Sequence, residues 1–199
     1  MHAGRILARN YMPTEDDILN FSINKHAFYE TFITMGGLSI RMTHMPGDRD
    51  GLRKIRHLFE NITAVIFTVD LACYDQVLPE NAHQNRLMEE LFVFEAMVNN
   101  RWLTRSSILL FLGNVNLLSE KLSQSPFQNH FPDYCGGSDV NDASKYILSL
   151  FNRANKSNHD LYPHLVEFSD LMNMQLVLAA LKDTVIQNRL NRLLLSPYY

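Results

Sequence analysis

The residues best placed to do chemistry in this sequence are polar side chains that directly follow apolar runs. They fall in four short segments, each after a predicted strand: His44–Gly51, Asp70–Gln84, Gly113–Asn116 and Glu167–Leu171. In folds built from parallel strands, ligands bind where the carboxyl ends of the strands meet the following loops. These four segments are therefore the predicted ligand-binding loops.

Two groups of reactive side chains near these loops suggest chemistry of their own. His44, Asp48 and His57 have the donor atoms of a metal site, but their spacing matches no common ligand pattern, which favours ordinary surface positions. Cys73 with His83 suggests a thiol nucleophile. Cys73 lies just after a predicted buried strand, however, which favours a structural thiol.

Composition and charge argue against a nucleic-acid partner. The chain has 199 residues and a net charge of −3, which fits one domain, or one domain and a fragment. Arg101, Trp102 and Arg105 combine positive charge with an aromatic ring, but a single such cluster in an acidic chain is weak support for nucleic-acid binding.

The sequence also indicates the cellular compartment in which the protein is expected. Two cysteines do not make a disulfide framework, so a reducing compartment is expected. The longest apolar runs, such as Ile108–Leu112, are the length of a strand and too short to span a bilayer, and Met1–Arg5 shows neither a signal-peptide core nor a Met-Gly start for myristoylation. A cytoplasmic protein without a membrane span is therefore expected.

Strands are predicted from apolar and β-branched runs. Ile62–Val69 and Ser107–Leu112 have the continuous apolar pattern of strands covered on both faces. The remaining predictions are a weak strand at His164–Phe168 and a β-hairpin formed by His26–Thr34 and Leu38–Thr43 around Gly36 and Gly37.

Helices are predicted between these strands. Their segments are Arg53–Phe59, Asn85–Asn99, Asp139–Phe151 with Asp139 as cap, and Leu171–Leu193. Thr14 with Asp17 fits either a helix start with a capping box or a charged turn, and the spacing does not decide between them. Asn85–Asn99 and Leu171–Leu193 each have an apolar stripe, while Glu89, Glu90 and Asp142 are interpreted as solvated surface. Alternating strands and helices predict an α/β fold with a mostly parallel sheet covered by helices on both faces.

Several ordered segments together resemble the C-terminal part of heterotrimeric G-protein α subunits. The resemblance is strongest in Phe59–Phe67, Tyr74–Leu78 with Asn85 and Arg86, Asn99–Leu112, and Phe131–Tyr134. It runs from about Arg5 to Leu190 and implies a three-layer Ras-like P-loop GTPase fold that lacks the first strand and the P-loop. On this basis residues 1–20 are expected to be a remnant of the family's helical insert and linker, and residues 21–199 a partial Ras-like domain.

The resemblance places the family's phosphate and magnesium positions on substituted residues. The sequence has no G-x-x-x-x-G-K-[ST] loop to cradle phosphates. The family's catalytic Arg corresponds to Ser22 and its water-orienting Gln to Asp48, while the two magnesium-shell positions hold Lys25 and His44. Gly47 matches the glycine that senses the γ-phosphate.

The guanine-reading positions implied by the resemblance are substituted as well. The motif Asn-Lys-x-Asp has become a segment in which Gly113 and Asn114 replace the Asn and Lys, and Asn116 replaces the guanine-binding Asp. An amide can accept only one of the two hydrogen bonds that a carboxylate accepts from guanine. Phe168 stands where the family has an Ala close to the base, and Glu167 adds negative charge beside it.

The resemblance also implies cofactors and partners. They are GTP or GDP with Mg²⁺, the G-protein βγ dimer, and a G protein-coupled receptor, with the protein in the cytoplasm or peripheral at the inner face of the plasma membrane. Arg49, Arg53 and Lys54 keep basic character on the surface that binds βγ in the family. The substitutions predict that nucleotide binding is weak or absent and that this chain does not hydrolyse GTP.

Three interpretations of function remain open from the sequence. The first is a divergent α-subunit-like signal transducer, the second is a non-enzymatic interaction module that binds βγ, and the third is a truncated gene product. The family's missing first strand lies between the strands that resemble Leu38–Thr43 and Ile62–Val69, so the isolated chain is expected to be only marginally stable.

Overall fold

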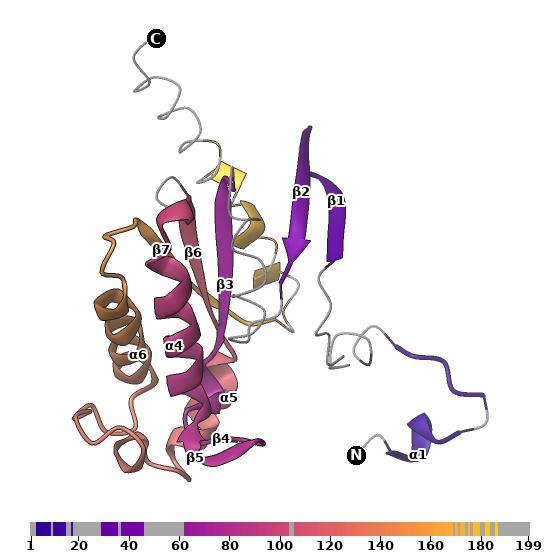
Figure 1. Ribbon diagram of the computed structural model, residues 1–199. Helices are drawn as coiled ribbons and strands as arrows, with labels where there is room; N and C mark the ends of the chain where they lie inside the picture. Colours follow the sequence, from indigo (N-terminus) through magenta and orange to yellow (C-terminus); the bar gives the residue numbers. More distant parts are fainter. Residues whose placement is uncertain are drawn as a thin grey trace. The chain divides into compact units, whose positions relative to one another are not determined.

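The computed structural model describes most of the chain between residues 62 and 168 and shorter stretches elsewhere (Figure 1). The described residues are 3–8, 10–14, 17, 29–35, 37–45, 62–103, 106–168, 170, 172–173, 175, 177–179, 182–183 and 186. The chain divides into two compact units, Met1–Pro46 and Gly47–Tyr199, and each is described by itself.

The first unit contains a short helix, α1 (Ala3–Ile6), and a hairpin made of β1 (Tyr29–Met35) and β2 (Leu38–His44). The two strands are antiparallel, with Ile33 opposite Ile40. Gly37 in the turn has φ of +80°, a backbone conformation that glycine adopts without strain. The hairpin predicted around the glycine pair is therefore confirmed.

Of the two alternatives for Thr14 and Asp17 in the first unit, the structure has the capping box. The Asp17 backbone N–H donates to Thr14 Oγ1 at 3.3 Å, and the Asp17 carboxylate accepts from the Thr14 backbone N–H at 2.8 Å. These are the two reciprocal bonds that define the motif. Arg5 reinforces it, because its guanidinium reaches the same carboxylate at 2.5 Å and 2.7 Å.

The second unit is built on three parallel strands in the order β3 (Ala64–Asp70), β6 (Ser107–Gly113) and β7 (Leu161–Val166). All seven residues of the central strand β6 are buried, as its uninterrupted apolar run predicts. The α/β prediction with a parallel sheet is thus confirmed for the part of the chain that is described.

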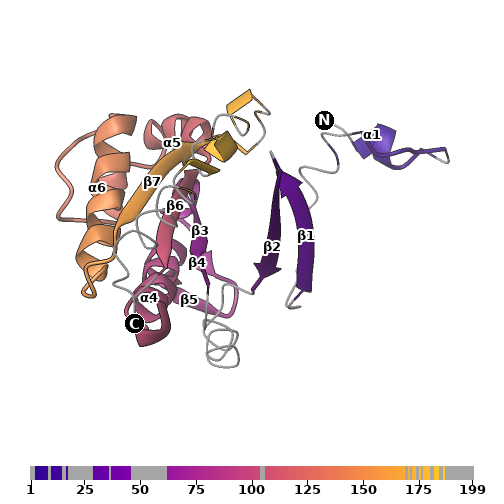
Figure 2. The ribbon, with the colours of Figure 1, turned by 90° about the horizontal axis from the view of Figure 1, so that it is seen from above.

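Two helices, α4 (Arg86–Val98) and α6 (Val140–Ala154), lie together on one side of this sheet (Figure 2). Phe67 of β3 meets Phe94 of α4 edge to face at 5.2 Å between ring centres and Phe151 of α6 at 6.3 Å. The two helix rings also meet each other, at 5.0 Å. This aromatic group fixes both helices on the sheet.

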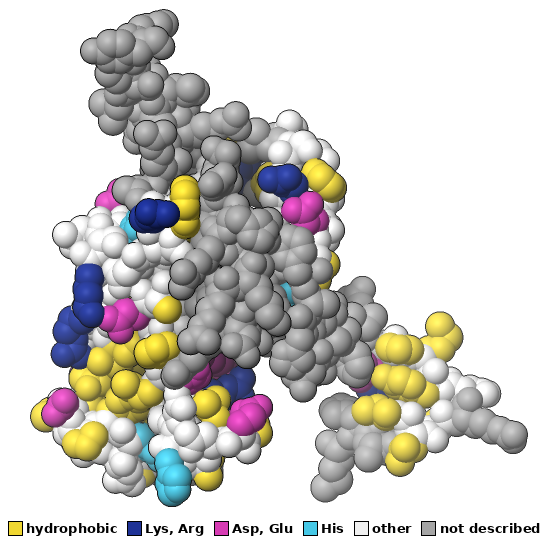
Figure 3. Space-filling model, in the orientation of Figure 1, with side chains coloured by type: hydrophobic (Ala, Val, Ile, Leu, Met, Phe, Trp, Pro, Cys, Tyr) yellow, Lys and Arg dark blue, Asp and Glu magenta, His cyan; other side chains and the backbone are white. Residues whose placement is uncertain are grey.

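Both helices begin at a side-chain cap, which was predicted for Asp139 and not for Asn85. The Asn85 side chain accepts from the Met88 backbone N–H at 3.1 Å, and Asp139 accepts from the N–H groups of Asn141 and Asp142 at 2.8 Å and 2.9 Å. Each cap satisfies donors that a helix leaves unpaired in its first turn. Helix α4 also has two exposed apolar side chains, Met88 and Phe92. Figure 3 shows apolar side chains gathered at the lower left of the face that it draws.

The remaining elements connect the strands and helices. They are η2 (Leu71–Cys73), β4 (Val77–Leu78), β5 (Asn81–Asn85), η3 (Arg101–Leu103), α5 (Val115–Leu122) and η4 (Phe127–Asn129). Phe127 lies at the centre of a second aromatic group, with ring centres 4.9 Å from Tyr74, 4.7 Å from Phe131 and 4.9 Å from Tyr134. No described helix is both long and apolar enough to cross a membrane.

Two strand predictions need correction. The third parallel strand covers Leu161–Val166 instead of His164–Phe168, so Glu167 and Phe168 lie in the loop beyond it. The expected burial on both faces is wrong for β3, because Ile66 is 40% exposed while Val65 and Val69 on the opposite face are buried. The face of β3 that carries Phe67 packs on Phe94 of α4, which accounts for the burial on that face.

Two predicted helices lie mainly outside the described residues. None of Arg53–Phe59 is described, and Leu171–Leu193 is described only in part. The residues described within Leu171–Leu193 are helical.

Candidate functional site

The three parallel strands end at the same level of the sheet. Asp70 is the last residue of β3, and it lies opposite Gly113, the last residue of β6. Gly113 in turn lies opposite Val166, the last residue of β7. The loops that follow Asp70, Gly113 and Val166 therefore start side by side, as predicted for ligand-binding loops.

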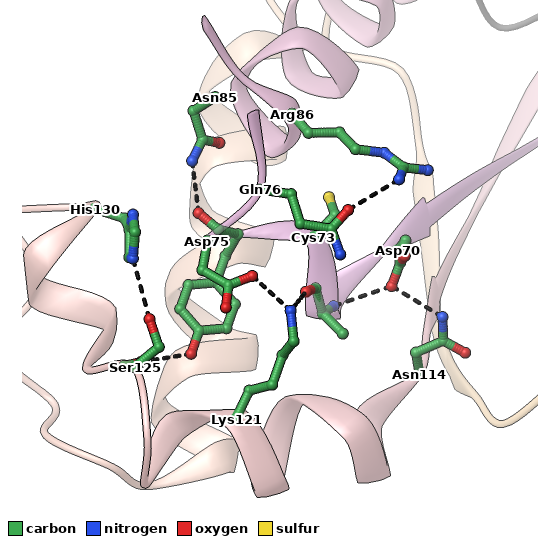
Figure 4. Close-up of polar contacts among 12 residues, drawn as sticks. Asp70, Cys73, Asp75, Gln76, Asn85, Arg86, Asn114, Lys121, Ser125 and His130 are labelled. Carbon is green, nitrogen blue, oxygen red and sulfur yellow. Dashed lines mark hydrogen bonds and ion pairs between the residues drawn. The ribbon is translucent and has the colours of Figure 1, made fainter. Parts of the chain in front are cut away.

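The loop after β6 is tied to the loop after β3. Asn114 has a left-handed backbone conformation, with φ of 63° and ψ of 40°, which Asn tolerates better than most residues. Its side-chain Nδ2 donates to Asp70 Oδ1 at 2.9 Å, and the same oxygen accepts from the Ala72 backbone N–H at 3.0 Å (Figure 4). The Asp70 carboxylate thus orients both loops.

The first turn of α5 faces the loop after β7. The Asn116 backbone N–H, one of the donors that the helix leaves unpaired, points to Glu167 Oε2 at 3.5 Å. A carboxylate in this place is favoured by the positive end of the helix dipole. The Glu167 carboxylate therefore lies at the N-terminal end of α5.

The third contact at this edge joins Phe168 and Gly113. A Cβ atom added to Gly113 would lie 2.1 Å from Cε2 of the Phe168 ring and 2.8 Å from Cδ2. Separations under 3.0 Å are essentially never observed for real Cβ atoms. The Phe168 ring thus lies directly against the Gly113 backbone, in the space that a side chain at position 113 would need.

A second layer of polar contacts supports these loops (Figure 4). Lys121 of α5 donates to the Ala72 carbonyl at 2.8 Å and forms an ion pair with Asp75 at 2.5 Å. Tyr74 donates its hydroxyl to the Ser125 carbonyl at 2.5 Å. The C-terminal end of α5 is consequently fixed to the segment after β3.

The Glu90 side chain of α4 also contacts the end of β3. Its carboxylate accepts from the Asp70 backbone N–H at 3.2 Å and lies 3.8 Å from the Cys73 sulfur. Burial raises the pKa of Glu90 to about 7, because it disfavours the charged form. The interpretation of Glu90 as solvated surface is therefore wrong.

The same surroundings bear on the thiol interpretation of Cys73. The Cys73 side chain is fully buried, and burial together with the nearby Glu90 and Asp70 carboxylates raises its pKa. A thiol with a raised pKa stays protonated and is a poor nucleophile. The structure supports the structural role expected for Cys73.

The structure brings together Gly113, Asn114, Asn116 and Phe168, the four described residues predicted to face the base. His44 lies in the other unit at the end of β2, where its ring stacks on Tyr29 with 4.6 Å between ring centres. The other predicted site residues lie outside the described part of the chain: Ser22, Lys25, Gly47, Asp48, Arg49, Arg53 and Lys54.

Sequence reasoning missed the roles of Asp70 and Lys121. Asp70 had a signal, since it is an acidic residue directly after an apolar run at a strand end. Lys121 had none, because its partners Ala72 and Asp75 are 49 and 46 residues away. Within the described residues no three His, Cys, Asp or Glu side chains gather as a metal site would require.

Comparison with known proteins shows which proteins this chain is similar to. The family model described as G-protein alpha subunit matches residues 1–185. The guanine nucleotide-binding protein alpha-3 subunit of Neurospora crassa is 48% identical over 186 residues, which are 94% of this chain and 52% of that protein.

Two further relatives give the same result. The alpha-2 subunit of Saccharomyces cerevisiae is 44% identical over 187 residues, 94% of this chain and 42% of that protein. The guanine nucleotide-binding protein subunit alpha of Cryptococcus neoformans is 42% identical over 186 residues, 94% of this chain and 43% of that protein. The chain spans about half the length of the curated relatives it matches.

Proposed function

Because the chain belongs to the G-protein α subunit family, we propose that it is an α-subunit-like transducer of heterotrimeric G-protein signalling that acts through protein contacts and has lost nucleotide binding and hydrolysis. The observation that carries the proposal is the loop at the end of β6. Its polar groups are bonded within the chain, Asn114 to Asp70 and the Asn116 N–H toward Glu167.

The residues at this edge do not fit a guanine base. A carboxylate at position 116 would accept two hydrogen bonds from guanine, whereas the Asn116 amide accepts one and places a donor against the other. An unpaired donor of this kind costs about 1–3 kcal/mol. The Glu167 carboxylate adds charge of the same sign as a nucleotide's phosphates, and the Phe168 ring fills space beside Gly113.

The proposed partner is the βγ dimer, bound through the basic residues Arg49, Arg53 and Lys54. A surface that no longer depends on nucleotide would bind βγ equally well with and without GTP, because a ligand shifts an equilibrium only if it binds the two states differently. We extend the proposal to receptor contact and to peripheral location at the inner face of the plasma membrane, both by family membership.

Isothermal titration of the folded chain with GDP, GTP and ATP tests the nucleotide part of the proposal. We expect no saturable heat at micromolar concentrations of any of the three. Submicromolar binding of GDP or GTP with strong discrimination against ATP would refute the loss of nucleotide binding.

A pull-down with the βγ dimer tests the partner part. We expect equal retention with and without a GTP analogue, and reduced retention of the double variant Arg53→Glu/Lys54→Glu. Arg153→Glu, on an exposed position of α6, is the matched charge-reversal control. Absence of retention under both nucleotide conditions would count against this partner.

A further inference from the structure

We propose that the Phe168 ring is a built-in substitute for a bound base, and that Gly113 and Phe168 together decide whether the carboxyl edge of the sheet admits a planar ring. The inference rests on the proposed function, because it explains how an edge that binds guanine nucleotide in related proteins stays closed here. The ligand class excluded by the ring is a purine or similar flat heteroaromatic ring.

The need for glycine at position 113 comes from the ring and not from the backbone. Among the described glycines, Gly37 and Gly137 have positive φ and Gly113 does not. The backbone conformation of Gly113 is therefore one that any residue can adopt. What a side chain would meet is the Phe168 ring, with three ring carbons at 2.1, 2.8 and 3.0 Å from the added Cβ. Gly113 and Phe168 are therefore a matched pair in which one residue provides the space that the other fills.

The backbone that carries the ring is held independently of the ring. The Glu167 N–H donates to Asn173 Oδ1 at 3.0 Å, and the Asp170 N–H donates to the Glu167 carbonyl at 3.0 Å. Asp170 Oδ1 in turn accepts from the N–H groups of Met172 and Asn173. None of these bonds involves the Phe168 side chain. Removal of the ring should therefore leave a flat vacancy instead of a collapsed loop.

A vacancy of this kind has a predictable chemistry. Gly113 is buried at the end of the central strand, so one wall of the vacancy is backbone with no side chain. Cavities left by large apolar side chains remain open to small aromatic ligands of matching size. The site should therefore accept a flat ring in place of the phenyl group.

A double-mutant cycle between positions 113 and 168 tests the pairing. Gly113→Ala in the unaltered chain should reduce the ratio of folded to unfolded protein about tenfold or more, as overpacking does. In the Phe168→Ala background the same change should reduce it less than about threefold, because the colliding ring is gone. Gly113→Ala combined with Phe92→Ala, which truncates an exposed Phe on α4, should retain the full effect.

Ligand titration of the same variants tests the substitution for a base. Guanosine and indole are added at millimolar concentration while the thermal unfolding midpoint is followed. Phe168→Ala should show a ligand-dependent rise in midpoint, and at ten times the dissociation constant the folded to unfolded ratio should rise about elevenfold. The unaltered chain and Phe92→Ala should show none, and Phe168→Leu replaces Phe168→Ala if the latter does not fold.

The proposal is overturned if the cycle shows no coupling, or if neither ligand stabilises the Phe168 variant more than the unaltered chain. These failures are distinct from a failure of the proposed function. Tight GDP binding by the unaltered chain would refute the loss of nucleotide binding, whereas absent coupling would remove only the role of the ring.

Discussion

Asp70 and Asn114 join the ends of two neighbouring parallel strands, because the Asn114 side-chain amide donates a 2.9 Å hydrogen bond to the Asp70 carboxylate. The same carboxylate accepts from the Ala72 N–H and starts the short helix η2. One side chain thereby sets the direction of two loops that would otherwise diverge from the sheet.

Replacement of Asn114 should separate the hydrogen bond from the backbone conformation. Asn114→Ala loses the bond to Asp70 and places a residue with a Cβ in the left-handed region, at a combined cost of about 2 kcal/mol in unfolding free energy. Asn114→Gly loses only the bond and should cost about 1 kcal/mol. Urea unfolding of both variants measures the difference, and equal costs would contradict the role of the left-handed conformation.

Lys121 should contribute far more to stability than a surface lysine. Lys121→Met leaves the Ala72 carbonyl and the partly buried Asp75 carboxylate without this donor, at a cost of about 1–3 kcal/mol. Lys145→Met removes an ion pair in which the Lys145 side chain is 75% exposed and the Asp142 side chain 54%. Its loss should lower the unfolding free energy by less than about 0.5 kcal/mol. Denaturant unfolding of the two matched variants checks the contrast, and similar costs would refute it.

Glu90 should make stability fall as the pH rises. Its pKa of about 7 in the folded chain lies above the usual 4.5, so the folded state binds the proton more tightly than the unfolded state. The resulting stabilisation is complete below the usual pKa and is lost as the pH rises through about 7. Over that pH window we expect the unfolding free energy to fall by about 1–3 kcal/mol. The side chain is 22% exposed, so solvent weakens the effect of burial.

Glu90→Gln is the variant that isolates this effect. The glutamine cannot ionise, so the unfolding free energy should depend less on pH between about 5 and 8 than in the unaltered chain. Glu120→Gln, at an exposed position of α5, is the control and should leave the dependence unchanged. An unaltered pH profile in Glu90→Gln would show that another group is responsible.

GTP hydrolysis should be absent even when one catalytic position is restored. The resemblance predicts that Ser22 takes the position of an Arg worth about a thousandfold or more in rate, and the sequence carries no P-loop motif. Asp48→Gln alone should therefore produce no hydrolysis above the buffer rate in a single-turnover assay. Hydrolysis at a normal G-protein rate in Asp48→Gln or in the unaltered chain would contradict the prediction.

Hydrogen exchange should distinguish the two units. The amides of β6 lie in a strand that is buried along its whole length and paired on both sides, so they should exchange most slowly. The β1–β2 hairpin has two strands and an exposed Phe32, and such hairpins are marginal alone. Equal protection in β2 and β6 would contradict this ranking.

The predictable part of the fold came from signals that are local in the chain. Asp139 marks a helix start because a cap bonds to residues two or three positions ahead. The β7 bounds were wrong because Pro163 interrupts the apolar pattern, yet an edge strand tolerates a residue that donates no ladder bond. The family match confirms the predicted resemblance and the Ras-like α/β fold.

For the candidate site, the sequence allowed residues to be named but did not predict how they are arranged. The named residues stand at motif positions and are Gly113, Asn114, Asn116 and Phe168. The contacts that define the site join residues 44 to 55 positions apart, such as Asn114 with Asp70 and Phe168 with Gly113. Such contacts depend on how strands are ordered in the sheet, which local sequence patterns do not encode.

The pairing of Phe168 with Gly113 also restricts which residues position 113 can hold. Any side chain there, alanine included, would place its Cβ 2.1 Å from the Phe168 ring as the structure has it. A larger residue at position 113 is therefore tolerated only if the ring moves or a smaller residue replaces Phe168. The residue acceptable at one of these positions depends on the residue at the other, so the two cannot be redesigned separately.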